Sequence, residues 1–279
     1  MRYINKKCEK IFKEIKKKDE HNQLPDDLSR CLEIMEKDFA PVIKGYKLYP
    51  YTPTIKYQTN AVGHKKIRFD IYWIEDLYVD MTPGAKDTFT FKLGHEIGHK
   101  KCTKVDKAGD FWLFTFIIGV ISVIFGISIA IWLKKEFWIS CGVVIVAALA
   151  AAMVLIGGVF RKIIIFEQHV CECHADFCGI DKMENKEKMD IKSALTWIHK
   201  RCNSMELFEK DHYTHPSTAK RYGYLMHGIF DDVVIKNIAD DIFGDQKSHL
   251  ATWYVEKVIS YYKEEKNFIK EKNLTKPLT

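Results

Sequence analysis

The stretch FKLGHEIGHK, residues 91–100, places His95, Glu96 and His99 in the pattern H-E-x-x-H. In an α-helix, residues four apart are rotated by about 400°, so the two histidines point the same way and can reach one ion. Glu96 then lies beside the ion without binding it, where its carboxylate can take a proton from a water molecule. Imidazole nitrogens suit Zn²⁺, and a catalytic zinc site has three protein ligands and an open position. The motif therefore requires a third ligand from elsewhere in the chain.

Candidates for that ligand occur in FEQHVCECHADFCGI, residues 166–180, where Glu172 and Asp176 are four residues apart. Glu172 as third ligand and Asp176 as the carboxylate that orients a ligand histidine would complete a site of two histidines and one glutamate. Two other interpretations remain open. The carboxylates could be ordinary exposed helix residues, or the stretch could hold a separate structural zinc site built from its cysteines and histidines, namely His169, Cys171, Cys173, His174 and Cys178. Helical geometry disfavours the second, because Cys171 and Cys173 face different directions.

Two segments without a charge, 111–133 and 138–160, lie between these motifs, and each has 23 residues. A bilayer core of about 30 Å needs about 20 helical residues, so both segments are long enough to span it. Only residues 134–137 separate them, which predicts a transmembrane hairpin. The alternative is a buried hairpin inside a large soluble core.

A hairpin would leave residues 1–110 and 161–279 on the same side of the membrane. Positive charges near the span ends favour the cytoplasm as that side, for the shared side and for the outer loop respectively: Lys100, Lys101, Lys104, Lys107, Arg161 and Lys162 against Lys134 and Lys135. The sequence thus predicts an integral membrane protein with both termini and the active site in the cytoplasm. The eight cysteines follow a charged N-terminus that lacks a secretory signal, so we expect reduced thiols.

The remaining pattern predicts a mainly α chain with a small β-sheet, an α+β fold interrupted by the hairpin. We expect an N-terminal helical region (1–57), a first enzyme segment (58–110), a second (161–265) and a polar tail (266–279). Residues 66–80 alternate in a way that favours strands. The first 20 residues predict an amphipathic helix that either docks on the protein or lies on a membrane. The net charge of +6 is too small to indicate a nucleic-acid partner.

A third stretch, HYTHPSTAKRYGYL at residues 212–225, completes an ordered set of motifs. H-E-x-x-H, a membrane hairpin, E-x-x-x-D and then T-H-P-S-x-x-x-R resemble the HtpX and CAAX prenyl protease 1 family of integral-membrane gluzincin metallopeptidases, over roughly residues 58–226. The resemblance implies that His95, His99 and Glu172 bind one Zn²⁺ per chain and that Glu96 is the catalytic base.

The resemblance also assigns roles to three further positions. His215 would line the active site and help to stabilise the tetrahedral intermediate, and Arg221 would be the ion-pairing arginine near the site. Asn60, with Ala61, would correspond to the Asn-Ala pair ahead of the family's edge strand, which predicts a substrate-binding residue. The chain departs from the family in lacking apolar spans before H-E-x-x-H and in the cysteines around Glu172.

These observations favour a zinc metalloendopeptidase that acts on protein or peptide substrates. His99 precedes 111 by 12 residues and Glu172 follows 160 by 12, so a helical connection keeps the site within about 18 Å of the lipid. Membrane proteins are therefore expected among the substrates. The alternative is a membrane-anchored metal-binding sensor, similar to sensor-transducer proteases, with regulatory or vestigial proteolysis. The T-H-P-S-x-x-x-R segment favours the enzyme, and a four-residue outer loop leaves no room for a ligand-binding domain.

Overall fold

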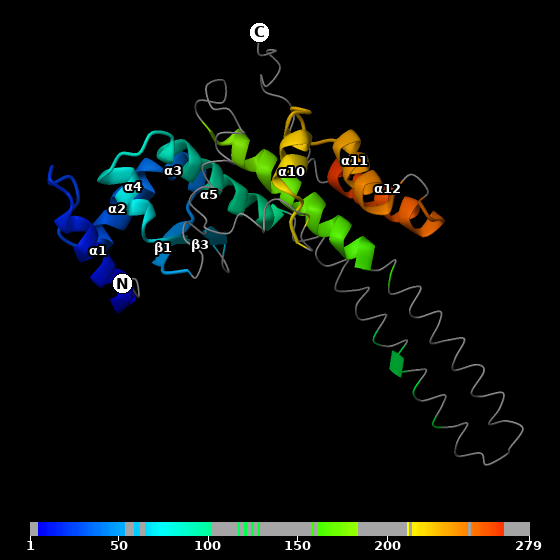
Figure 1. The fold of residues 1–279 in the computed structure, drawn as a ribbon, viewed down its shortest axis with the longest axis horizontal. Helices are drawn as coiled ribbons and strands as arrows, with labels where there is room; N and C mark the ends of the chain where they lie inside the picture. Colours follow the sequence, from blue (N-terminus) through cyan, green and yellow to red (C-terminus); the bar gives the residue numbers. More distant parts are fainter. Residues whose placement is uncertain are drawn as a thin grey trace, which may run out of the picture.

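The computed structural model describes residues 5–53, 59–61, 65–101, 161–183, 211, 214–244 and 247–264, with isolated positions at 117, 120, 121, 124, 128 and 158. Helices dominate these residues and one small sheet accompanies them, which confirms the expected balance of secondary structure (Figure 1). Within the described ranges, no helix is both long enough and apolar enough to span a bilayer. The two predicted spans, 111–133 and 138–160, lie almost entirely outside the described residues, as does the polar tail.

The N-terminal layer contains α1 (Lys6–Lys17), α2 (Leu28–Asp38) and α3 (Ala40–Ile43). Side-chain caps fix where the first two helices begin, because Asn5 accepts the backbone N–H of Lys7 and Asp27 accepts that of Arg30. The apolar stripe of α1 packs into the core, as its docking interpretation predicts, through three buried residues: Cys8, Phe12 and Ile15.

The sheet consists of β1 (Lys47–Tyr51), β2 (Thr59–Ala61) and β3 (Lys66–Asp70), in the order β1-β3-β2. β1 runs parallel to β3, whereas β2 runs antiparallel to it and forms an edge of the sheet. β1 was not expected, since it falls in the region interpreted as helical.

The predicted strand structure over 66–80 is wrong beyond Asp70. The Asp70 side chain accepts the backbone N–H of Tyr72 at 3.3 Å, a local turn that competes with strand pairing, and α4 (Trp73–Tyr78) follows. Trp73 and Ile74 are both fully buried, although adjacent residues of a strand point to opposite faces. The aromatic and branched residues that favoured a strand therefore fill the core from one side of a short helix.

The H-E-x-x-H helix is α5 (Ala85–Lys101), and Phe89 ties it to the N-terminal layer. The Phe89 ring lies 5.0 Å from Phe39, 5.7 Å from Phe69 and 5.0 Å from Trp73, measured between centroids. These contacts join α5 to the end of α2, to β3 and to α4. They fix the orientation of the helix that carries both histidines.

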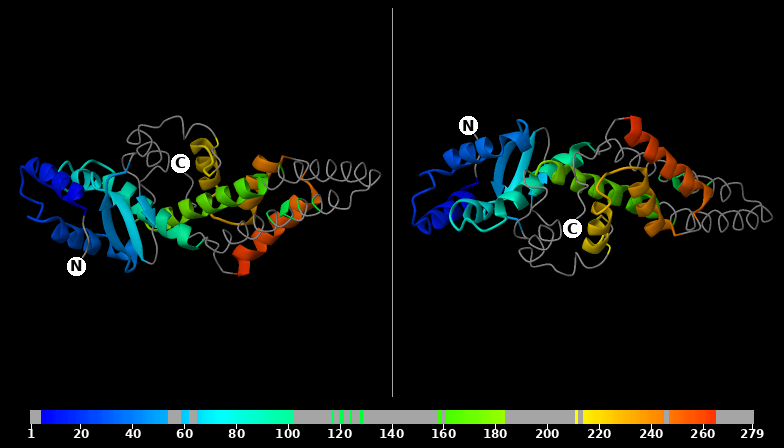
Figure 2. Two further views of the ribbon diagram at one scale, coloured as in Figure 1. Left: turned by 90° about the horizontal axis from the view of Figure 1, so that it is seen from below. Right: turned by 90° about the horizontal axis from the view of Figure 1, so that it is seen from above.

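A helix over 161–181 packs against α5, and three more helices follow it: α10 (Thr218–Leu225), α11 (Asp232–Phe243) and α12 (His249–Glu264). Figures 1 and 2 show the N-terminal helices and the sheet on one side of this central pair, with α11 and α12 on the other. The pair is thus buried from both sides. Each motif found in the sequence lies on it or on the segment leading into α10.

Candidate metal centre

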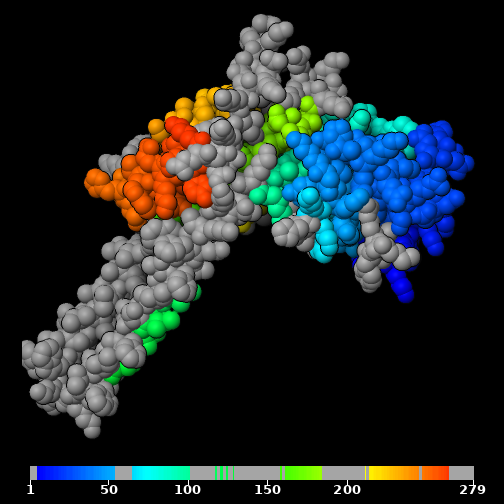
Figure 3. Space-filling view, turned by 180° about the vertical axis from the view of Figure 1, so that it is seen from behind, coloured from blue at the N-terminus to red at the C-terminus, as the bar shows by residue number. Residues whose placement is uncertain are grey.

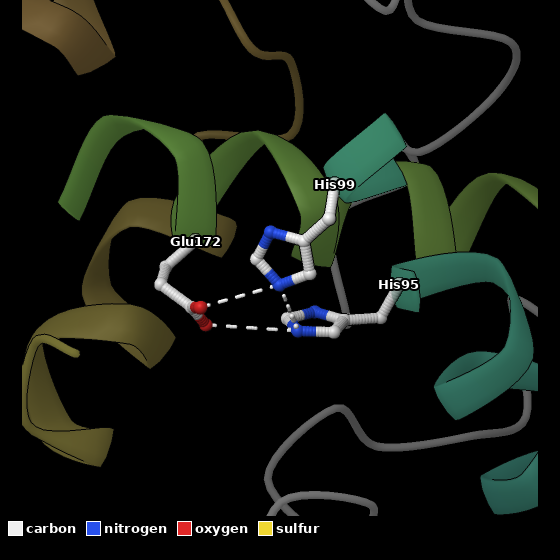
Figure 4. A group of neighbouring side chains, drawn as sticks. All are labelled: His95, His99 and Glu172. Atoms are coloured by element: carbon white, nitrogen blue, oxygen red, sulfur yellow. Dashed lines mark hydrogen bonds and ion pairs between the residues drawn. The ribbon is translucent and has the colours of Figure 1, made fainter. Parts of the chain in front are cut away.

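Three potential ligand atoms converge where α5 crosses the 161–181 helix (Figure 4). His95 Nε2 and His99 Nε2 lie 3.0 Å apart, Glu172 Oε1 lies 3.2 Å from His99 Nε2, and Glu172 Oε2 lies 3.6 Å from His95 Nε2. His95 and Glu172 are buried, whereas His99 is partly exposed. The three residues face one point with one open side.

This convergence depends on glycine, because the two backbones nearly touch. A Cβ added at Gly98 would lie 2.7 Å from the Cα of Ala175, and one added at Gly94 would lie 2.9 Å from the Cα of Gly179. A Cβ on Gly179 would in turn lie 2.7 Å from the carbonyl oxygen of Phe91. Larger residues at these positions would separate the helices and pull Glu172 away from the histidines.

Asp176 fixes the tautomer of His95. Its Oδ1 lies 2.8 Å from His95 Nδ1, so Nδ1–H donates to the carboxylate and Nε2 keeps its lone pair toward Glu172. Arg221 donates to the same carboxylate through Nε at 2.7 Å and Nη2 at 2.5 Å. The Asp176 side chain is fully buried, and this pair of bonds satisfies it.

The donor set fits a tetrahedral divalent cation. Nitrogen and oxygen ligands at 2.0–2.1 Å from zinc stand about 3.3 Å from each other, and the three separations here bracket that value. Glu172 Oε2 is buried and has no hydrogen-bond partner among the described residues, which a cation would remedy. Zn²⁺ would displace the proton between the histidines and Glu172 on binding.

The charges at the site are held in the forms that a metal needs. Burial alone would raise the pKa of Glu172, but the surrounding histidines outweigh it and lower that pKa to about 2. Burial likewise opposes ionisation of Asp176, and the charge of Arg221 with the hydrogen bond from His95 keeps its pKa well below the usual range. Desolvation works against the Arg221 cation too, yet Asp176 raises its pKa overall. Both carboxylates are therefore anionic at neutral pH.

Comparison with known families agrees with this geometry. A model of peptidase family M48 matches residues 44–227, about two thirds of the chain. The chain belongs to peptidase family M48. No curated protein and no solved structure matches it. The match confirms the suspected family, begins before the region over which the resemblance was noted, and identifies the chain as a metallopeptidase of a metal-dependent, typically zinc-dependent, family.

Two further residues of the M48 pattern lie at the site. His215 Nε2 is 3.2 Å from Glu172 Oε1, and its side chain is 44% exposed, so it borders the open side of the cluster without joining it. Glu96 is buried on α5 between the two histidines. The Tyr51 phenol faces Glu96 closely enough that, after burial and Asp70, the Glu96 charge contributes to raising the pKa of Tyr51 to about 12.

Asn60 lies in β2, opposite Arg68 of β3 in the sheet register. β2 packs beside α5, which brings this edge strand to the helix that bears the histidines. The orientation of the Asn60 side chain lies outside the described part of the structure. Its predicted contact with substrate stays a prediction.

The alternative zinc site on the 161–181 helix finds no support among the described residues. The one cluster there that meets metal-ligand spacing is His95, His99 and Glu172. Cys178 Sγ lies 3.9 Å from His174 Nε2, while the His174 ring packs on Phe230 and Tyr262 at 5.0 and 5.1 Å. Cys171, Cys173 and Cys178 are buried free thiols that fill the core.

Sequence reasoning missed two supports of the M48 site. The glycines of the helix crossing are visible in sequence as G-x-x-x-G at Gly94 and Gly98 and could have been found from that spacing. Asp211 could not: its Oδ1 accepts the backbone N–H of Ser217 at 2.9 Å and its Oδ2 pairs with Lys220 at 2.6 Å, which braces the turn that carries His215.

Proposed function

We propose that this M48 metallopeptidase is a zinc-dependent endopeptidase anchored in a membrane. The observation that carries the proposal is the cluster of His95, His99 and Glu172, with the His95 tautomer fixed by Asp176 and one side left open. A closed site of four protein ligands would favour a structural metal, whereas three ligands and an open side are typical of catalysis. Zn²⁺ bound there would polarise a substrate carbonyl and lower the pKa of a water molecule toward neutrality.

Glu96 acts as the general base in this proposal. It shares α5 with both histidines and is buried, so its carboxylate is held beside the ligands instead of in solvent. It takes the proton of the attacking water and passes it to the leaving amine as the peptide bond breaks. The neighbouring Tyr51 phenol stays protonated, because its raised pKa lies far above neutrality, and does not compete for that proton.

His215 donates a hydrogen bond to the oxyanion that forms from the substrate carbonyl. The Thr214 hydroxyl lies 2.5 Å from His215 Nδ1 and can donate to it, which leaves Nε2–H as the donor on the open side. Removing one such donor in other enzymes lowers kcat by about 10²–10³. Asp211 and Lys220 hold the turn in place for this role.

The membrane part of the proposal rests on the uncharged segments 111–133 and 138–160, which form a two-span hairpin with both termini and the active site in the cytoplasm. Substrates are polypeptides, membrane proteins among them, because the hairpin is inserted between the second histidine and Glu172. A simple tether could be attached at either end of the chain. An insertion between metal ligands couples the height of the site to the bilayer.

Metal content and proteolysis of the detergent-purified full chain test the catalytic part. We expect one zinc per chain in the wild type. Glu96→Gln should keep the zinc and lose cleavage of an unfolded protein substrate, whereas Glu172→Ala should lose most of the zinc. Glu33→Gln, an exposed carboxylate on α2, is the matched control and should change neither. Stoichiometric zinc in a His95→Ala, Glu172→Ala double variant would contradict the assignment.

Replacing the hairpin with a short soluble linker tests the substrate class. If the hairpin sets the position of the site, the linker variant should still bind zinc and cleave a soluble unfolded protein but fail on a membrane-anchored substrate. Equal loss or equal retention of the two activities would refute the positioning role.

A further inference from the structure

The helices after the catalytic motifs form a bundle whose directions can be read from ring contacts. Tyr254 of α12 packs on Phe166 at 6.5 Å, and Tyr262, eight residues later, packs on His174, also eight residues later, at 5.1 Å. Equal spacing in the same sense means that α12 runs parallel to the 161–181 helix. Figure 1 shows the two side by side.

α11 runs the opposite way. Phe230, just before α11, packs on His174 at 5.0 Å and on Phe177 at 5.8 Å, whereas Phe243, its last residue, packs on Phe166 at 5.6 Å. The chain therefore reverses after Phe243 near the beginning of the 161–181 helix. By the register of α12, Trp253 stands level with residue 165 and Leu250 with residue 162.

That end of the bundle carries apolar and basic side chains on its surface. Leu250 is 38% exposed and Trp253 is 50% exposed, although large apolar residues are usually buried. Lys257 Nζ lies over the Trp253 ring, 5.1 Å from its centroid. Arg161 and Lys162 are exposed at the same level. Glu256, next to Lys257, is the acidic residue among the exposed positions of these turns.

Tryptophan and lysine together suit the boundary between lipid and water. The indole has an apolar body and a polar N–H, and it gathers at the level of lipid headgroups. Lysine extends an apolar stem along such a surface and keeps its ammonium among anionic headgroups. The described positions on the first uncharged segment show the same preference, since Ile117, Ile121 and Ile124 are 46%, 59% and 58% exposed on one helical face. Figure 3 shows these green positions standing clear of the folded body, below the orange and red helices.

We infer that the turn between α11 and α12 and the first two turns of α12 rest on the lipid surface, with Trp253 and Leu250 in the headgroup region and Lys257 among the phosphates. The inference rests on the proposed membrane hairpin, because Trp253 lies level with residues just after segment 138–160. Both helices follow residue 227, where the match to family M48 ends, so the family does not supply this contact. The bilayer then touches the molecule at a second place besides the hairpin and limits tilting of the 161–181 helix, which bears Glu172.

Tryptophan quenching by lipids with brominated acyl chains tests the contact on the full chain. The wild type and Trp253→Phe are reconstituted in vesicles of phosphatidylcholine and phosphatidylglycerol, with and without bromine. The difference between the two proteins isolates the emission of Trp253. We expect brominated lipid to remove much of this emission.

Val233→Trp in the Trp253→Phe background is the matched control. Val233 is 46% exposed at the opposite end of the same bundle, about 16 Å farther along the helix axis. Its new tryptophan should not be quenched beyond the Trp253→Phe background. Equal quenching of tryptophan at 233 and 253 would overturn the inferred orientation.

Failure of the contact and failure of the hairpin give different results. If the remaining tryptophans, which include Trp112, Trp132 and Trp138, are quenched but Trp253 is not, the hairpin stands and the second contact is wrong. If no tryptophan is quenched and alkaline carbonate releases the chain from the vesicles, the hairpin is wrong and the second contact falls with it.

Discussion

The N-terminal layer and the metal centre are both buried, yet different forces hold them together. In the layer of α1 to α4 and the sheet, apolar side chains fill the core and ion pairs stay at the surface, as between Lys47 and Glu36. At the metal centre, helices meet backbone to backbone and enclose charged Asp176 and Arg221. Burial of apolar groups tolerates local loss, whereas a buried charge depends on its one partner.

The comparison yields four predictions that pair free energy of unfolding with zinc affinity. Unfolding is measured in excess chelator, so that bound metal does not add to stability. Changes at the metal centre should alter both quantities. Changes in the N-terminal layer should alter stability alone.

Arg221→Met should have the largest effect, about 3–5 kcal/mol of destabilisation, because it leaves the fully buried Asp176 carboxylate without its cation. Zinc affinity should fall as well, since Asp176 loses the group that orients it toward His95. Lys263→Met, which breaks an exposed pair with Asp232, is the control and should cost at most about 1 kcal/mol. Similar values for the two variants would show that the buried pair is not critical.

Leu32→Ala should destabilise the chain by about 2–5 kcal/mol, because Leu32 is fully buried in the N-terminal layer and its removal leaves a cavity. Zinc affinity of the folded protein should not change. Ile34→Ala on the same helix removes a side chain that is 38% exposed and should cost much less. A loss of zinc affinity in Leu32→Ala would mean that the two regions are coupled.

Gly98→Ala should destabilise by about 1–3 kcal/mol and weaken zinc binding, because the added methyl meets the Ala175 backbone and separates the helices that carry the ligands. Gly223→Ala is the matched control: a Cβ there meets nothing within 4 Å, and alanine should stabilise α10 by up to about 1 kcal/mol. Denaturant unfolding and zinc titration distinguish the two. Unchanged zinc affinity in Gly98→Ala would refute the spacing role of this glycine.

Lys47→Ala should have the smallest effect, about 0.2–1 kcal/mol, because the Lys47 side chain is 59% exposed and its pair with Glu36 is screened by water. Glu36 still accepts the backbone N–H of Leu48 at 2.8 Å. The difference from wild type should shrink further in about 1 M salt, where the Debye length falls to about 3 Å. A larger or salt-independent loss would show that the surface pair contributes more than expected.

The sequence by itself determined the features that repeat within one helix. The four-residue spacings of His95 with His99 and of Glu172 with Asp176 set which side chains share a face, because helix geometry fixes that angle locally. The order of motifs was enough to indicate the family, and the family model confirmed it. Strand structure over 66–80 failed beyond Asp70, since local composition does not record that Trp73 and Ile74 share one core.

Only the tertiary structure decided the distances between segments that are far apart in the chain. Glu172 reaches within 3.2 Å of His99 because glycines let two backbones approach, and Arg221 meets Asp176 because α10 folds back over that crossing. Asp211 bracing the turn of His215, and Trp253 standing level with residue 165, likewise depend on packing. Periodicity fixes angles around one helix axis, but the separation and register of two helices are set by the side chains that fill the space between them.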